Sequence, residues 1–371
     1  MDNKIFKQRI AGLRKKMAEK NMDTIIILSD ENRMYLSGYT GVDGSYNETA
    51  GMLIITKNDL ILACDPRYDT QAEKEAPLYS IICYEKNFAE KLPEILKSVN
   101  ASKIGFESER LTLNNYNAIN KELKNAQVNI EIIPDNDMLK NLRIIKDEYE
   151  IATIKKALKI AEESFLQLKK LIKPGMTEKQ VAWTFEKIMR ENGADALSFD
   201  VIMAGGKNSA LPHAIPSNRK INNNEPLIID FGVRLDGYCS DTTRTLIMGK
   251  PTDEFEKIYN IVFQAQKMAI EKIKPGVKAS SIDKIARDYI DNTEYKGRFG
   301  HGLGHGVGIV IHEAPRLSRL DDSILEPGMI VTVEPGIYVP GWGGIRLENM
   351  IQVTNTGANV LNTLSYDDYL I

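Results

Sequence analysis

The chain has 371 residues, of which 43% are apolar and 27% charged, and its net charge is −3. This length favours two domains over one. Lys and Arg (48) nearly balance Asp and Glu (51), so there is no basic surplus for nucleic acid. The charged start of the chain lacks the apolar core of a signal peptide, and no stretch reaches the ~20 apolar residues of a membrane span. We therefore expect a cytoplasmic protein that binds neither nucleic acid nor membranes.

The first third of the chain alternates helical and strand patterns. Phe6, Ile10, Leu13 and Met17 fall at helical spacing and predict an amphipathic helix. Strands are predicted at 24–28, 51–55, 60–64, 80–84, 103–106 and 129–133, with helices at 87–99 and 112–124. This alternation predicts an α/β domain over residues 1–140, with a sheet covered by helices. Three cysteines at positions 64, 83 and 239 form no CxxC pair, so we expect buried free thiols in a reducing cytosol.

A long charged helix is predicted from about 147 to 170, at the start of a second domain over residues 141–371. This domain contains a faint internal repeat. LIKPG (171–175) and IKPG (273–276) each end one helical stretch, and each is followed by another helix and then by β-rich sequence. The shared order predicts two similar halves, each a helix pair with a sheet, that face each other across a cleft.

The segment 227–249 reads as a hairpin. Asp236-Gly237 is a favoured two-residue turn between strand-forming runs. With that turn, Asp230 pairs with Thr243, and Asp241 lies on the same face two residues away. Diagonal neighbours of this kind lie roughly 7–8 Å apart at the backbone. Both carboxylates can therefore converge on the same ions.

The segment 328–354 repeats this arrangement around the loop PGWGG. Glu334 and Glu348 are equidistant from Gly341, so a simple hairpin places them opposite each other. An isolated acid is more often the partner of Lys or Arg, or faces water at a strand end. Four acids on two hairpins are different, because so many like charges need compensation. Divalent cations are the compensation that we expect.

The four histidines all lie in the second domain, and three of them fall within HGLGHGVGIVIHE (301–313). Glycines at alternate positions allow close approach of backbone or ligand. One imidazole with four carboxylates suits Mn²⁺, with Co²⁺ or Zn²⁺ as alternatives. The GxGxxG within this stretch leads into an apolar run rather than a helix, so it does not indicate a dinucleotide site. The P-loop, GxSxG and HExxH motifs are absent.

Taken in order, LIIDFGVRLDGYCSDTTRT, GLGHGVGIVIHEAP, VEPGIYVP and GGIRLEN resemble the metallopeptidases with the pita-bread fold. Within them the chain is similar to Xaa-Pro aminopeptidases (aminopeptidase P) and prolidases. NRMYLSGYTG (32–41) and DPRYDTQA (65–72) resemble the first domain of that family. The resemblance implies an α/β creatinase/prolidase N-terminal domain, then an α+β pita-bread catalytic domain with an internal pseudo-twofold. It also implies a homodimer.

The resemblance also assigns roles to individual residues. It implies two divalent metal ions held by Asp230, Asp241, His305, Glu334 and Glu348, of which Asp241 and Glu348 bridge the ions. It implies that His213, His312, Tyr338 and Arg346 bind substrate, with His213, His312 and Glu334 taking part in catalysis. His301 receives no role. Asn349 stands where the family often has Asp, which could weaken an outer contact to Glu348.

The implied reaction is hydrolysis of the bond between an N-terminal residue and proline. Two ions about 3.5–4 Å apart would bridge a water and lower its pKa, and the hydroxide would attack the scissile carbonyl. We expect an Xaa-Pro aminopeptidase acting on peptides with proline at the second position. The alternatives are an Xaa-Pro dipeptidase and an inactive peptide-binding module. Creatinase lacks these ligands, and methionine aminopeptidases usually lack such an N-terminal domain.

Overall fold

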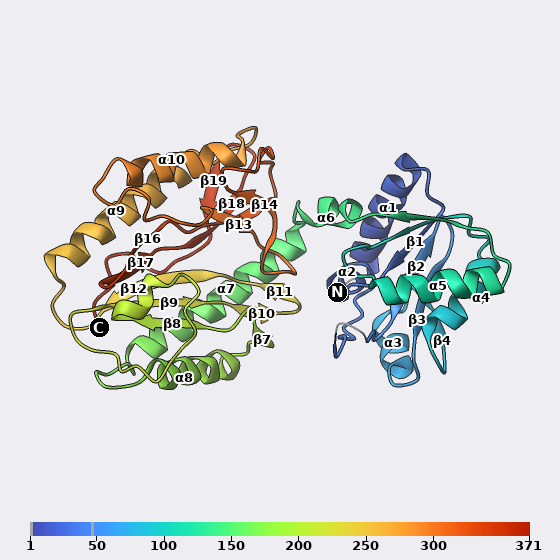
Figure 1. The fold of residues 1–371 in the computed structure, drawn as a ribbon, viewed down its shortest axis with the longest axis horizontal. Coiled ribbons are helices and arrows are strands. Elements are labelled where there is room, and N and C mark those ends of the chain that lie inside the picture. Colours follow the sequence, from blue (N-terminus) through green and yellow to red (C-terminus); the bar gives the residue numbers. More distant parts are fainter. Residues whose placement is uncertain (1–2, 46–47) are drawn as a thin grey trace. The chain divides into compact units, whose positions relative to one another are not determined.

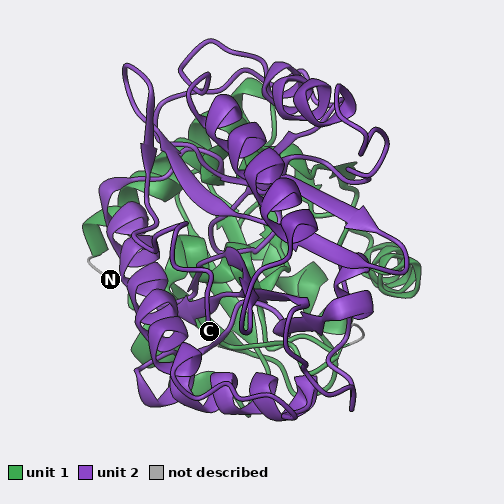
Figure 2. Ribbon diagram, turned by 90° about the vertical axis from the view of Figure 1, so that its left-hand side faces the viewer, with its two compact units in different colours: residues 1–143 green, residues 144–371 purple. Residues whose placement is uncertain are grey.

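The computed structural model describes residues 3–45 and 48–371, which separate into two compact units (Figure 2). Unit 1 is Met1–Arg143 and unit 2 is Ile144–Ile371. Each unit has buried apolar clusters of its own. Within the described ranges, no helix has both the length and the apolar character needed to cross a bilayer.

Unit 1 is a six-stranded sheet in the order β4-β3-β2-β1-β5-β6, flanked by helices (Figure 1). Strand β2 is antiparallel to both neighbours, and the other pairs are parallel. The strands are β1 (Thr24–Ile27), β2 (Met52–Thr56), β3 (Leu60–Cys64), β4 (Ser80–Cys83), β5 (Lys103–Phe106) and β6 (Glu131–Pro134). The helices are α1 (Asn3–Glu19), α2 (Asp30–Ser37), α3 (Asp69–Glu75), α4 (Phe88–Ser98), α5 (Leu113–Asn125) and α6 (Asp137–Arg143).

The strands and helices that the sequence predicts in this region are confirmed. Helix α1 buries Phe6, Ile10, Leu13 and Met17, as its spacing requires. The short helices α2, α3 and α6 were not predicted, because each has too few turns for a clear apolar period. Cys64 and Cys239 are buried free thiols, whereas Cys83 is exposed, so the expectation of three buried cysteines is wrong for Cys83.

Unit 2 contains two helix pairs with strands between them (Figure 1). The first pair is α7 (Glu148–Lys169) with α8 (Glu178–Glu191), and the second is α9 (Asp253–Ile270) with α10 (Ala279–Asp291). The predicted start of α7 is confirmed by a capping box, in which Asp147 and Glu150 each accept a backbone N–H of the other.

Two larger sheets and two small ones complete unit 2. The larger sheets have the orders β12-β9-β8 and β14-β13-β15-β18-β19, and the small ones are β11-β10-β7 and β16-β17. The strands are β7 (Ala196–Leu197), β8 (Ile202–Gly205), β9 (Pro226–Phe231), β10 (Val233–Leu235), β11 (Tyr238–Cys239), β12 (Thr242–Ile247), β13 (Gly304–Gly306), β14 (Glu313–Leu317), β15 (Ile330–Val333), β16 (Gly336–Val339), β17 (Gly343–Arg346), β18 (Asn349–Val353) and β19 (Ala358–Val360).

The predicted repeat is visible in matching details of the two halves, which we define as α7 to β12 and α9 to β18. Gly175 and Gly276 follow the first helix of each half, both in the left-handed region, at φ of 88° and 84°. Their N–H groups donate to Ile221 and Leu325 respectively, each at 2.9 Å. Each half therefore ends its first helix in the same way, with a backbone hydrogen bond to a later segment of that half.

Both predicted hairpin registers are confirmed, although each hairpin is divided between two sheets. Asp230 pairs with Thr243 in β9 and β12, in register with the turn at Asp236-Gly237. In the second half Gly336 pairs with Arg346, and Val333 pairs with Asn349. Glu334 and Glu348 thus occupy opposite positions at the break between the two strand pairs.

Candidate metal centre

Four acids lie at corresponding strand ends of the two halves, and one histidine joins them from the second half. Asp230 is the penultimate residue of β9, and Glu334 directly follows β15. Asp241 directly precedes β12, and Glu348 directly precedes β18. His305 is the middle residue of β13, between glycines. We call these five residues the acidic cluster.

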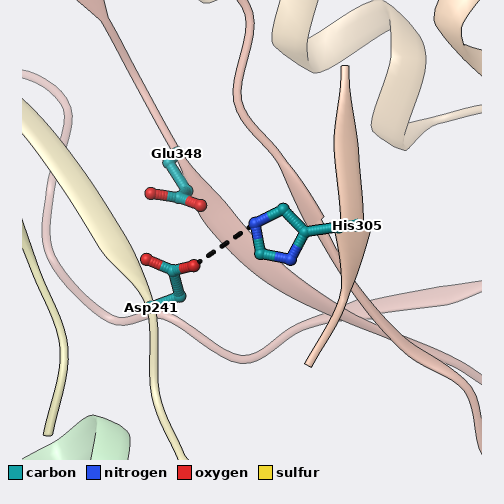
Figure 3. Close-up of side chains that lie close together, drawn as sticks. All are labelled: Asp241, His305 and Glu348. Carbon is teal, nitrogen blue, oxygen red and sulfur yellow. Dashed lines mark ion pairs between the residues drawn. The ribbon is translucent and has the colours of Figure 1, made fainter. Parts of the chain in front are cut away.

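The side chains of the acidic cluster converge. Figure 3 shows Asp241, Glu348 and His305 pointing toward one another from separate segments, and one ligand atom from each lies within 4.8 Å of the others. Nε2 of His305 lies 3.5 Å from Oδ2 of Asp241 and 3.3 Å from Oε1 of Glu334. Asp230, Asp241, Glu348 and His305 are all buried, with at most 9% of their surface exposed.

Two of the acids are poorly compensated by the protein itself. Burial and the neighbouring charge of Glu348 raise the pKa of Asp241 well above its usual value. Burial and the charges of Glu334 and Asp230 do the same to the pKa of Glu348. Burial also raises the pKa of Asp230, against the opposing charge of Arg346. Gathering ionised carboxylates in this way is unfavourable without a further positive charge.

Glu334 and His305 compensate each other. Burial alone would raise the pKa of Glu334, but the hydrogen bond and charge of His305 lower it to about 2. Burial alone would lower the pKa of His305, but its bond to Glu334 outweighs burial and the pKa is raised. Without a cation, His305 and Arg346 are the positive charges beside the carboxylates, at 3.3 Å from Glu334 and 2.6 Å from Asp230 respectively.

The donor set fits divalent cations. Oδ1 of Asp230 is buried and has no hydrogen-bond partner in the part of the chain that the structure describes. A buried carboxylate oxygen without a donor is rare, and a bound ion would satisfy it. Four carboxylates and one imidazole are the ligands that Mn²⁺, Co²⁺ and Zn²⁺ accept.

Neighbouring hydroxyl groups orient the cluster. Oγ1 of Thr243 donates to Oε2 of Glu348 at 2.8 Å, and Oγ1 of Thr332 donates to Oε1 of Glu334 at 3.1 Å. Nδ1 of His305 lies 3.1 Å from the carbonyl oxygen of Gly306. With a cation bound, donation from Nδ1 to this carbonyl would leave the lone pair of Nε2 for the ion.

Arg346 connects the cluster to two aromatic side chains. Its Nη2 donates to Oδ2 of Asp230 at 2.6 Å, and its Nη1 donates to the Tyr338 hydroxyl at 3.0 Å. Nδ1 of His301 lies 2.7 Å from the carbonyl oxygen of Gly302, and burial lowers the pKa of His301, so the neutral ring donates there. Nε2 of His301 then accepts from Tyr338, 2.9 Å away.

All five members of the acidic cluster line one cavity that opens to solvent. Its volume, including the opening, is about 770 Å³. His213, His312 and Arg346 also line it, so the structure brings these predicted site residues together. Tyr338 lies behind the cavity wall, bonded to Arg346. His312 stacks edge-on against His305, with ring centroids 4.4 Å apart. Burial and the neighbouring His305 lower the pKa of His312.

The sequence did not indicate several residues of the site. Thr243 and Thr332 read as ordinary strand formers, so nothing in the pattern separated them from their neighbours. His301 and Arg316 also line the cavity. The spacing HGLGH could have indicated His301, since it lies four residues before His305. The side chain of Asn349 accepts a hydrogen bond from Arg244 and donates one to the Tyr366 hydroxyl. Arg244 also donates to the backbone oxygen of Glu348.

Comparison with known proteins shows the family of the chain. The sequence model of metallopeptidase family M24 matches residues 152–355, which include the whole acidic cluster. The chain belongs to metallopeptidase family M24. The model of the creatinase/prolidase N-terminal domain matches residues 9–145. The M24 chain is therefore a peptidase with the predicted pita-bread fold, and its family implies divalent metal ions.

Relatives of this M24 peptidase match it over nearly their whole length. An Xaa-Pro dipeptidase of Pyrococcus furiosus is 37% identical over 356 residues, which is 96% of this chain and 98% of the relative. The structure of an Xaa-Pro dipeptidase from Bacillus anthracis superposes with a TM-score of 0.92 at 38% identity, covering 99% and 100% of the chains. An X-Pro aminopeptidase from Thermotoga maritima gives a TM-score of 0.87 at 34% identity, covering 95% and 98%.

Proposed function

We propose that this M24 peptidase is a two-metal Xaa-Pro dipeptidase. The observation that carries the proposal is the convergence of four carboxylates and one imidazole from the two halves of unit 2 in a single cavity. The relatives named Xaa-Pro dipeptidase favour this activity over the aminopeptidase that the sequence motifs suggested. The aminopeptidase stays the second candidate, because the Thermotoga maritima enzyme shares the fold.

Proline determines what the site must recognise. The bond before proline carries no N–H, and the ring fixes the backbone angle, so the enzyme must use the ring, the carbonyl and the chain ends. Two divalent ions bound to the acidic cluster would polarise the carbonyl and supply a water of lowered pKa. Mn²⁺ is the ion that we propose, with Co²⁺ or Zn²⁺ as alternatives.

We assign the chemistry of the protein to three side chains. Glu334 is ionised at neutral pH and accepts the proton of the attacking water, then delivers it to the leaving proline nitrogen. His312 is neutral because its pKa is lowered, and its N–H donates to the oxyanion that develops on the carbonyl. His213 lines the same cavity and is the second donor.

Arg316 is the residue that we propose for dipeptide selection. A dipeptide ends in a carboxylate next to the proline ring, whereas a longer peptide has a neutral amide there. Two arginines line the cavity, and Arg346 is already ion-paired with Asp230 at 2.6 Å. Arg316 is exposed and does not pair with Asp230, so its guanidinium can bind the substrate carboxylate.

The test is hydrolysis of Ala-Pro, its amide Ala-Pro-NH₂ and the tripeptide Ala-Pro-Ala, each with Mn²⁺. The dipeptidase proposal expects cleavage of Ala-Pro alone, and Arg316→Gln should abolish the preference for the free carboxylate. Arg319→Gln is the matched control, because Arg319 is an exposed neighbour that does not line the cavity. Efficient release of alanine from the tripeptide by the wild type would favour the aminopeptidase instead.

A further inference from the structure

Outside the cavity, one fully buried carboxylate makes an unusual number of hydrogen bonds. Glu178, the first residue of α8, is 0% exposed. Its Oε1 accepts from the backbone N–H of Gly205 at 2.9 Å. Its Oε2 accepts from the backbone N–H and the hydroxyl of Ser217, at 3.0 and 2.6 Å. The side-chain amide of Asn208 donates to both oxygens at 3.1 Å.

Gly205 and Ser217 directly flank one segment, residues 206–216, which we call the rim loop. The two oxygens of Glu178 therefore hold the loop at both ends. The backbone of α8 adds to this attachment, because the N–H of Lys179 donates to the carbonyl of Ser217 at 3.1 Å. Helix α8 is itself fixed, with a capping box at Thr177.

The rim loop touches the cavity at two places. His213 lines the cavity, and the carbonyl oxygen of Pro212 accepts from Nη1 of Arg346 at 3.0 Å. Leu211 and Ile215 of the loop are 60% and 85% exposed, whereas Ser209 is buried and its hydroxyl accepts from the N–H of Gly344 at 2.7 Å. The attachments at the ends of the loop therefore act together with the bonds of Ser209 and Pro212 to position His213.

We propose that Glu178 is a positioning residue of this peptidase, which places His213 and the Pro212 carbonyl at the substrate cavity. An ionised carboxylate suits this role, because charge-assisted hydrogen bonds are about twice as strong as neutral ones. A glutamine has one acceptor oxygen and would present its NH₂ group to donors at one end of the loop. The consequence for substrate rests on the proposed function, whereas the attachment of the loop does not.

Glu178→Gln is the test variant, and the chain offers a closely matched control. Glu107 in unit 1 accepts from two backbone N–H groups, one serine hydroxyl and one asparagine amide, as Glu178 does. None of the residues that line the cavity belongs to unit 1. Glu107→Gln therefore removes the same kind of hydrogen-bonded carboxylate without touching the rim loop.

The measurements are amide hydrogen exchange of residues 206–216, bound metal, and KM and kcat for Ala-Pro. In Glu178→Gln we expect faster exchange in the rim loop, wild-type metal content and a kcat lowered roughly 10- to 100-fold, because small displacements of groups at the reacting carbonyl have effects of that size. The change in KM should be smaller than the fall in kcat, because His213 is assigned to the oxyanion. Glu107→Gln should leave rim-loop exchange and kcat at wild-type values.

An unchanged kcat in a variant whose rim loop exchanges faster would overturn the proposal, as would wild-type exchange in that loop. If Glu178→Gln does not fold, Ser217→Ala removes the hydroxyl bond to Glu178 and the two bonds that Asn208 and Arg219 donate to that hydroxyl, and it should give the same changes at smaller size. A wild type that cleaves no Xaa-Pro peptide would refute the proposed function, yet the exchange comparison would still decide whether Glu178 holds the loop.

Discussion

Asp241 and Glu348 contribute the charges that the protein compensates least. Both are buried, and both have a pKa raised by burial and by the other acids. Thr243 supplies one hydrogen bond to Glu348, but a hydroxyl does not neutralise a charge. A bound cation would neutralise the repulsion between these buried carboxylates.

We expect Asp241→Asn to lose bound metal and activity together. Thr243→Val keeps the shape of the side chain but removes the bond to Glu348, and outer partners of this kind change metal affinity by about 10- to 100-fold. The loss in Asp241→Asn should be larger than in Thr243→Val. Metal analysis after dialysis and turnover of Ala-Pro measure both. Normal turnover in Asp241→Asn would contradict the proposed ligand role.

The pH dependence of metal-free protein follows from the raised pKa values. An acid whose folded pKa lies above its unfolded value of about 4 destabilises the fold when ionised. This penalty is complete above the folded pKa and is relieved as pH falls through it. The raised pKa of His305 acts in the same direction, because its stabilising charge is lost as pH rises.

We therefore expect the unfolding free energy of metal-free protein to increase when pH falls from about 8 to about 5. Asp241→Asn should show a flatter dependence, since one of the penalised charges is gone. Urea unfolding in the presence of a chelator, at several pH values, measures both curves. Superimposable slopes for the two proteins would show that Asp241 does not carry this penalty.

Strand β13 holds His305 between two glycines that have no room for a side chain. A Cβ at Gly304 would lie 2.0 Å from the carbonyl oxygen of Thr332, and one at Gly306 would lie 2.2 Å from that of Ala314. The alternate glycines thus allow close approach of neighbouring backbone. This position of His305 depends on the absence of side chains beside it.

Gly304→Ala should lower the unfolding free energy by about 1–3 kcal/mol or more, because the added methyl group forces β13 away from β15. It should also weaken metal binding, since His305 moves with the strand. Gly300→Ala is the control, because a Cβ at Gly300 has no atom within 4 Å among the described residues. Equal stability of the two variants would show that β13 tolerates the displacement.

At the scale of elements, the sequence predicted most helices, the strands of unit 1 and both hairpin registers. It did so because short-range patterns carry them: the turn at Asp236-Gly237 and the symmetry about Gly341 each determine one register. The division of each hairpin between two sheets was not predicted. A Cβ at Gly232 would lie 1.9 Å from the backbone oxygen of Ser240, so the strands come too close there for regular pairing to continue. No short sequence pattern predicts a contact of this kind.

The residues of the candidate site were likewise predicted only where a local pattern or the family resemblance indicated them. The acids stood out because charge within apolar runs is unusual, and the resemblance to a family supplied His213, His312 and Arg346. The attachment of the rim loop by Glu178 depends on partners 27 and 39 residues away. Such contacts appear only after the chain has folded.

At the scale of the whole molecule, units 1 and 2 have separate cores, and the acidic cluster belongs entirely to unit 2. We expect two calorimetric transitions, of which Mn²⁺ shifts only that of unit 2. A ligand at 100 times its dissociation constant stabilises the folded state by about 2.7 kcal/mol. Asp241→Asn should remove the shift, and a shift of both transitions would contradict the assignment.

The acidic cluster draws Asp230 and Asp241 from the first half of unit 2 and Glu334 and Glu348 from the second. Each half supplies two of the four carboxylates that the proposed two-metal site needs. If that proposal holds, a small displacement of one half against the other would release ions into solution. An indicator dye for free Mn²⁺ would then report the displacement of the two halves during heating or storage, or in destabilised variants.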